Sequence, residues 1–248
     1  MPNIINHMMN HRSIRNYDAQ KDVSDADLAT IIQAGQMAPN SINGQQVSVI
    51  AVRDQQRREY LAELTGEQVW IAQAPVFLVF LMDFYRASLA AKKWGRNFDF
   101  VKSSTAVITG SLDVGLFVQN VINAAESLGL GTVPIGGVHK DVDVFSEYFN
   151  LPKYVHPIVG LCVGYPTDLP KIKPRMPLKA ILHEEDYNPD IMEDIIHDYD
   201  ESFAKYLTSI NRADYEVNWS QNTSKYYETN YSPAETSTLK KQGFTLED

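Results

Sequence analysis

The run Val76-Phe77-Leu78-Val79-Phe80-Leu81-Met82 is the longest continuous apolar stretch of the chain. Pro75 precedes it and Asp83 follows it. A short uninterrupted apolar run of this kind is typical of a strand that is buried on both faces. It is too short to cross a bilayer, which takes about 20 apolar residues in a helix. The sequence therefore predicts a fully buried strand here.

Other elements can be placed outward from this strand. Apolar, β-rich patterns predict further strands over residues 47–53, 132–135 and 154–164. Helical periodicity predicts helices over residues 24–38, 54–64, 104–128, 142–149 and 190–207. Residues 83–100 mix aromatic and basic side chains and indicate an exposed helical or irregular insertion. The helix at 104–128 is apolar around most of its circumference, which favours burial in the core or against a second subunit.

Composition excludes several classes of protein. The 248 residues suit one large domain or two small ones, and 44% of them are hydrophobic. A net charge of -9 argues against nucleic-acid binding, which needs a basic face. The single cysteine, Cys162, lies in an apolar run and excludes an internal disulfide framework. Because no signal peptide or membrane span is recognised, we expect a cytoplasmic protein.

Two basic clusters stand out in this acidic chain. The first is His11-Arg12-Ser13-Ile14-Arg15-Asn16-Tyr17, and the second is Lys171-Ile172-Lys173-Pro174-Arg175-Met176-Pro177. Arginine binds phosphate or carboxylate oxygens through paired hydrogen bonds, so both clusters together suit one anionic ligand. The alternative for each is a solvated surface loop.

Motifs for self-contained catalysis are absent from the sequence. It contains no serine-hydrolase elbow, no P-loop and no metalloprotease helix motif, and the six histidines show no close-spaced pairing typical of metal ligands. Such a sequence fits a protein whose cofactor carries the reaction. Gly136-Gly137 follows a predicted strand and would let a flat ligand approach the backbone closely.

The ordered set of motifs resembles the nitroreductase superfamily, and within it the oxygen-insensitive NADPH nitroreductases and flavin reductases with a long C-terminal arm. The resemblance rests on the His11–Arg15 segment, the polar loop after Ala38, Gly66-Glu67-Gln68, residues 125–131, Ile135-Gly136-Gly137, residues 160–166 and residues 173–177. It implies an α+β fold of three layers, in which helices flank a mixed, mainly antiparallel sheet. It also implies an FMN-binding domain over residues 1–184, a C-terminal arm over residues 185–248 that packs on the body or on the partner subunit, and an intertwined homodimer.

The resemblance also implies a set of FMN contacts. His11, Arg12, Ser13 and Arg15 match contacts to the phosphate and ribityl chain, and Lys173 and Arg175 match a second basic contact. Asn40, Ser41 and Ile42 match a loop that is contributed by the other subunit. Gln68 matches a side chain that bonds the pyrimidine edge of the flavin, and Ile135, Gly136 and Gly137 match the segment that faces the ring near N5.

The implied activity is ping-pong reduction of nitroaromatics, quinones or free flavin, with hydride passing from NADPH or NADH to FMN N5. No residue of the chain is then expected to be catalytic, although Lys173 is a candidate for electrostatic stabilisation, and no metal is expected. The arm offers only Arg212, beside Asp214, for a nucleotide 2′-phosphate, so the preference for NADPH over NADH stays open. Two alternatives also stay open: a flavin-dependent dehydrogenase or dehalogenase with a dedicated substrate, and a non-catalytic flavin-binding protein.

Overall fold

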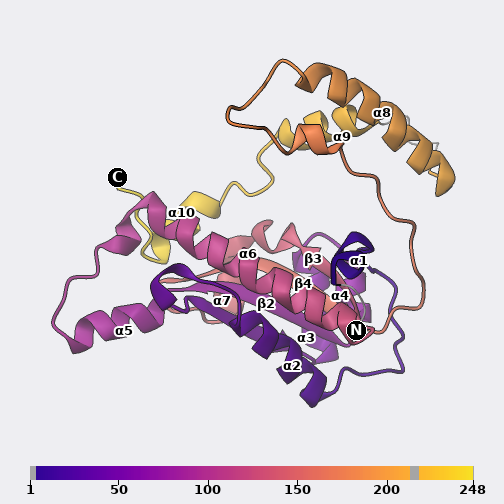
Figure 1. Cartoon of the computed structure of the whole chain (residues 1–248). Coiled ribbons are helices and arrows are strands. Elements are labelled where there is room, and N and C mark those ends of the chain that lie inside the picture. Colours follow the sequence, from indigo (N-terminus) through magenta and orange to yellow (C-terminus); the bar gives the residue numbers. More distant parts are fainter. Residues whose placement is uncertain (1–3, 213–217, 248) are drawn as a thin grey trace. The chain divides into compact units, whose positions relative to one another are not determined.

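A computed structural model describes residues 4–212 and 218–247 of the chain (Figure 1). It divides into two compact units. Unit 1 comprises Met1–Pro170 together with Tyr231–Asp248, and unit 2 comprises Lys171–Asn230. The expected boundary lay after residue 184. In the structure unit 2 begins at Lys171, and the last stretch of the chain, from Tyr231, belongs to unit 1. Phe244 is fully buried and Leu239 nearly so, and both pack in the core of that unit.

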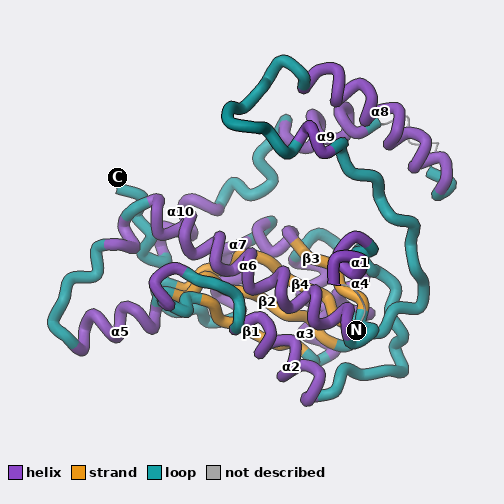
Figure 2. Tube along the Cα trace, viewed as in Figure 1, coloured by secondary structure: helices purple, strands orange, loops and turns teal. Residues whose placement is uncertain are grey.

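A four-stranded antiparallel sheet forms the centre of unit 1 (Figure 2). The strand order is β1-β2-β4-β3, in which β1 is Val47–Val52, β2 is Val76–Asp83, β3 is Gly131–Ile135 and β4 is Val155–Gly164. Every residue of β2 is buried, which confirms the prediction from its apolar run. A parallel bridge joins Ser13 to Thr132 of β3, so the expected mixed but mainly antiparallel character is also confirmed.

Helices cover both faces of this sheet and complete three layers. Because side chains alternate along β2, Leu78 and Phe80 pack with α2 (Asp25–Gln36) and α6 (Ser104–Ser127). Phe77 and Val79 pack on the other face with α3 (Gln55–Leu64), α4 (Trp70–Gln73) and α7 (Val142–Tyr148). The expected α+β class is therefore confirmed.

Helix α6 has one buried face and one exposed apolar face. Gly110 lies on the buried face, where an added Cβ would come within 2.4 Å of the Met82 side chain, so this glycine serves packing within the chain. Ile108, Leu112 and Leu116 are 67%, 60% and 38% exposed and form a stripe at helical spacing. The helix has the length and hydropathy of a membrane span, but its other face packs in the core, as in the central helix of a globular domain.

Three further helices lie in the described part of unit 1. These are α1 (Ile4–Met9), α5 (Tyr85–Lys93) and α10 (Glu235–Lys241). The segment expected to be helical or irregular after β2 therefore contains a helix, and 3₁₀ turns lie at Ser41–Asn43, Gly136–His139 and Phe100–Lys102.

The described residues of unit 2 form two helices, α8 (Met192–Ser209) and α9 (Trp219–Tyr227), and a 3₁₀ turn at Leu178–Ala180. A capping box of Asn218 and Gln221 begins α9. The Trp219 ring lies edge-on against Tyr199 of α8, with 5.8 Å between ring centroids. Ser220 of α9 donates both its backbone N–H (2.8 Å) and its hydroxyl (2.5 Å) to the Asp200 carboxylate of α8.

Candidate functional site

The N-terminal basic segment is fixed along the edge strand β3. Ser13 bridges Thr132, and the Ile14 N–H donates to the Thr132 carbonyl at 2.8 Å. Ile14 and Tyr17 are buried, and the Tyr17 hydroxyl donates to the Ile14 carbonyl at 2.7 Å. Burial raises the pKa of Tyr17 far above its usual value, so this hydroxyl stays protonated. The segment is therefore an ordered part of the sheet edge, which disfavours the loose surface turn.

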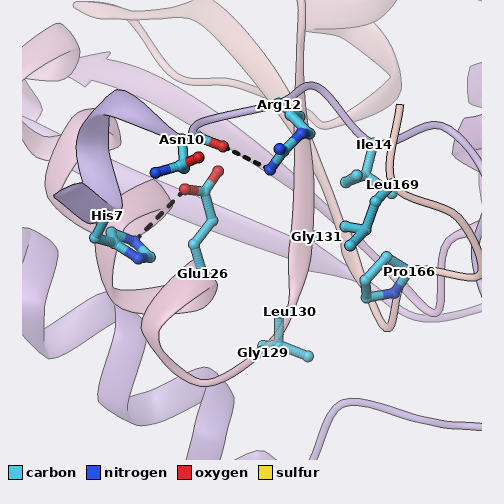
Figure 3. A pocket seen from close by; sticks show the side chains of 10 residues that line it. All are labelled: His7, Asn10, Arg12, Ile14, Glu126, Gly129, Leu130, Gly131, Pro166 and Leu169. Atoms are coloured by element: carbon cyan, nitrogen blue, oxygen red, sulfur yellow. Dashed lines mark hydrogen bonds and ion pairs between the residues drawn. The ribbon is translucent and has the colours of Figure 1, made fainter. Parts of the chain in front are cut away.

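Arg12 lines a hollow of about 230 Å³ with residues of α1, the end of α6 and the turn before β3 (Figure 3). Its guanidinium donates to the Asn10 carbonyl at 3.0 Å, while its Nε is buried without a partner among the described residues. Glu126 enters the same hollow, where its carboxylate lies 2.6 Å from His11 Nδ1 and 3.6 Å from His7 Nε2. The His11 ring is therefore already paired with the Glu126 carboxylate. Arg12 Nε, in contrast, has no partner among the described residues and can donate to a ligand.

Arg15 lies apart from this hollow and is exposed. Its guanidinium carbon sits 5.3 Å from the centroid of the Trp70 ring, in cation–π geometry. Trp70 is the first residue of α4, two positions after Gln68. The sequence analysis did not single out Trp70, because a lone tryptophan in a short helix carries no pattern. The Trp70 ring therefore supports an exposed Arg15 guanidinium.

The Gly136-Gly137 turn lies against Gln68. A Cβ on Gly137 would come within 2.2 Å of the Thr65 carbonyl and 2.3 Å of Gln68 Nε2, so only glycine fits there. A Cβ on Gly136 would meet nothing within 4 Å, so this residue borders open space. Ile135 is 1% exposed and its side chain packs in the core, which leaves only its backbone for a ligand. The structure thus brings Gln68 and the turn together.

The polar loop at Asn40–Ile42 is held by α6. The Ser41 N–H donates to both oxygens of Asp113, at 3.1 and 3.2 Å, and burial raises the pKa of this carboxyl. Asn40 Oδ1 accepts from the Gln45 N–H at 3.0 Å. Ile42 has a left-handed backbone (φ 50°) and is 97% exposed. Asn40 and Asp113 line a hollow of about 180 Å³ that shares no lining residue with the Arg12 hollow.

Lys173 and Arg175 belong to unit 2 and line a hollow of about 600 Å³ within it. The aromatic side chains of Tyr199, Phe203 and Trp219 line the same hollow. The Tyr199 hydroxyl donates to the Pro174 carbonyl at 2.7 Å, which fixes the basic segment against α8. Arg212 is exposed beyond the C-terminus of α8, and Asp214 lies outside the described residues. A cationic rim beside aromatic faces suits a ligand that carries both rings and phosphate.

Comparisons with known proteins identify the family of the chain. The nitroreductase family model matches residues 8–165, and the model of the nitroreductase family C-terminal domain matches residues 173–247. The chain therefore belongs to the nitroreductase family.

Named relatives place it more closely within that family. It is 43% identical to an FMN reductase [NAD(P)H] of Bacillus subtilis over the full length of both chains. It is 38% identical to an oxygen-insensitive NADPH nitroreductase of Salmonella typhimurium, over 79% of each. The solved structure of B. megaterium NfrA2 covers both chains completely, with a TM-score of 0.97 and 43% identity. That of an NADPH:FMN oxidoreductase from Vibrio harveyi, complexed with NAD+, covers 98% of each chain, with a TM-score of 0.86 and 31% identity.

Proposed function

We propose that this chain is an FMN-dependent NAD(P)H oxidoreductase that reduces flat oxidised acceptors, namely nitroaromatics, quinones or free flavin. The observation that carries the proposal is the open face at Gly136, with Gln68 packed on Gly137 and a cationic segment fixed along the neighbouring strand β3. Full-length relatives with FMN reductase and nitroreductase names support the same activity.

The residues present fit FMN on two structural grounds. Arg12 has a buried Nε with no partner among the described residues, and Arg15 presents an exposed guanidinium, so phosphate donors are available. A side chain at position 137 would collide with Gln68, and the space beside Gly136 is open, which suits a flat ring lying against the backbone. His11 is the weaker phosphate candidate because it is paired with Glu126.

In this proposal FMN supplies hydride acceptance and donation at N5, and the residues of the chain bind and orient it. Arg12, Ser13 and Arg15 hold the phosphate end. The Gln68 amide, which donates to the Thr65 carbonyl at 2.9 Å, keeps its carbonyl oxygen for the pyrimidine edge. Lys173 and Arg175 would add positive charge, and Lys173 near the N1–O2 edge would stabilise negative charge on the reduced ring.

The active form in this proposal is a homodimer in the cytoplasm. The exposed stripe of Ile108, Leu112 and Leu116 on α6 is the kind of apolar face that a second copy would cover. Gly115 on the same side meets nothing within 4 Å, so another backbone can approach there. Ile42, 97% exposed at the tip of its loop, would then reach the site of the partner. Two incomplete sites would be completed by association.

Anaerobic titration of the purified protein with NADPH or NADH tests the activity. We expect the flavin absorbance to bleach and then to recover when a nitroaromatic compound or a quinone is added. Bleaching without recovery would favour a dedicated substrate. A flavin that neither nucleotide reduces would leave the non-catalytic binding protein as the better account.

A further inference from the structure

Three residues far apart in the sequence, His139, His156 and Glu235, lie close together in unit 1. His139 ends the 3₁₀ turn Gly136–His139, His156 lies in β4 and Glu235 begins α10. Glu235 Oε2 is 2.9 Å from His139 Nδ1, and Glu235 Oε1 is 2.6 Å from His156 Nε2. His156 is 1% exposed. All three belong to unit 1, and we call this group the Glu235 clasp.

The hydrogen-bond partners fix the protonation of the clasp. His139 Nδ1 faces the carboxylate, and its Nε2 lies 2.7 Å from the Ile158 carbonyl. Both partners only accept hydrogen bonds, so both ring nitrogens of His139 carry hydrogen and the ring is an imidazolium. His156 Nε2 also faces the Glu235 carboxylate, and His156 Nδ1 is buried without a partner among the described residues.

A bound metal ion fits this geometry less well. The donor set of two histidines and a carboxylate is a common one, and the three ligand atoms lie within 4.8 Å of one another. Two donors on a tetrahedral zinc ion would lie about 3.3 Å apart, given bonds of roughly 2.0–2.1 Å. The observed separations of 2.6 and 2.9 Å are those of hydrogen bonds. Metal bound at Nε2 of His156 would also leave a buried N–H at Nδ1 without an acceptor.

The clasp holds the turn that contains Gly136 and Gly137. The Lys140 N–H donates to the Gly137 carbonyl at 3.0 Å, which closes the turn around His139. The Ser232 hydroxyl lies 2.6 Å from the His139 carbonyl and 3.0 Å from Glu235 Oε2. Ser232 and Glu235 therefore hydrogen-bond to the backbone and to the side chain of His139, respectively. The C-terminal segment has other anchors, including Phe244, which is fully buried.

We propose that Glu235 is a positioning residue, whose charged pairing with His139 fixes the Gly136-Gly137 turn and ties its geometry to the anchoring of residues 231–247. The importance of this turn for flavin rests on the function proposed above, whereas the clasp itself does not. Glu235 thereby acts on the site from the far end of the chain.

The clasp gives this arrangement a defined pH dependence. Burial disfavours the His139 imidazolium, but the hydrogen bond and charge of Glu235 and the Ile158 carbonyl outweigh it, so the pKa of His139 lies above its usual 6.5. Burial likewise opposes the Glu235 carboxylate, but His139 and His156 outweigh it and hold its pKa well below the usual 4.5. The ion pair between Glu235 and His139 is therefore fully formed between pH 4.5 and pH 6.5. It is lost as the pH rises through the raised pKa of His139.

The test compares Glu235→Gln and Glu235→Ala with Lys240→Gln, which removes one exposed charge from the same helix. NMR titration of the histidine rings in the intact protein, assigned with His139→Asn, gives the midpoint of His139. We expect that midpoint above 6.5 in the parent and in Lys240→Gln, and lower by about one pH unit in Glu235→Gln. Hydrogen exchange of residues 136–139 should be about tenfold faster in both Glu235 variants, the equivalent of one charge-assisted hydrogen bond.

An unchanged His139 midpoint and unchanged exchange at residues 136–139 in Glu235→Gln would overturn the proposal. So would stoichiometric zinc binding by the parent protein that Glu235→Gln abolishes, because the cluster would then be a metal site. These readouts need no flavin turnover. A chain that shows the expected exchange and titration but binds no FMN would refute the proposed function and leave the clasp standing.

Discussion

At the scale of single residues, the two adjacent glycines of the turn have different tasks. Gly137 is required by packing within the chain, because a Cβ there would collide with the Thr65 carbonyl and Gln68. Gly136 has no such neighbour, so packing within the described chain does not demand a glycine. We therefore expect the flavin ring to occupy the space beside Gly136.

Replacing each glycine by alanine separates these tasks. Gly136→Ala should keep its melting temperature within about 2 °C but bind FMN roughly tenfold more weakly, since the new methyl group stands where the ring lies. Gly137→Ala should lose about 1–3 kcal/mol of stability through overpacking. Gln56→Ala, at an exposed position of α3 outside the proposed site, is the control that should change neither property. Thermal melts measure the stability and titrations measure the FMN affinity. An unchanged FMN affinity in Gly136→Ala would show that the flavin does not lie beside Gly136.

At the scale of elements, the sequence of α6 predicted that the helix is buried but did not identify what covers it. Its apolar circumference predicted burial and left open whether the core or a second subunit supplied it. The structure assigns Gly110 and Val114 to the core and leaves Ile108, Leu112 and Leu116 exposed. The exposed stripe is the basis of the dimer proposal.

Leu112→Glu tests the use of this stripe. A carboxylate in the middle of an apolar interface costs several kcal/mol when it is desolvated without a partner, so the variant should be monomeric at micromolar concentration. Gln56→Glu introduces the same charge at an exposed position of α3, away from the stripe, and should leave the association unchanged. Sedimentation velocity distinguishes the two. A dimeric Leu112→Glu protein would place the subunit interface on another surface.

The elements that the sequence predicted are those set by local patterns. The apolar run of β2, the Ser24 cap of α2 and the glycine stop after α6 are each encoded within a few neighbouring residues. The Glu235 clasp is not, because 96 positions separate His139 from Glu235 and only the return of the chain to unit 1 joins them. Residues 83–100 were ambiguous because they mix aromatic and basic side chains, and the helix α5 that forms there buries no residue.

At the scale of the whole molecule, the residues proposed to contact FMN and the nucleotide are distributed over both units. Unit 1 carries the turn, Gln68 and the N-terminal arginines, and unit 2 carries Lys173, Arg175 and Arg212. The chain leaves unit 1 after Pro170 and returns at Tyr231, so unit 2 is connected to it at both ends. The nucleotide contact proposed for Arg212 lies in this inserted unit.

Arg212→Ala tests that contact. We expect kcat/KM for NADPH to fall about tenfold, the value of one charge-assisted hydrogen bond to the 2′-phosphate, while kcat/KM for NADH stays within twofold. Lys205→Ala removes an exposed cation from the preceding helix and serves as the control. Equal losses with both nucleotides would show that Arg212 acts on something other than the 2′-phosphate.

If the segment His11–Arg15 binds the phosphate of a flavin, the protein must distinguish FMN from riboflavin, which lacks that phosphate. Fluorescence titration of deflavinated protein should give an FMN affinity at least about a hundredfold above that for riboflavin, as expected from two charge-assisted phosphate contacts. Arg15→Ala should reduce this ratio about tenfold, whereas Arg57→Ala, which removes a similar cation–π pair over Tyr148, should not. Equal affinities for FMN and riboflavin would contradict the account.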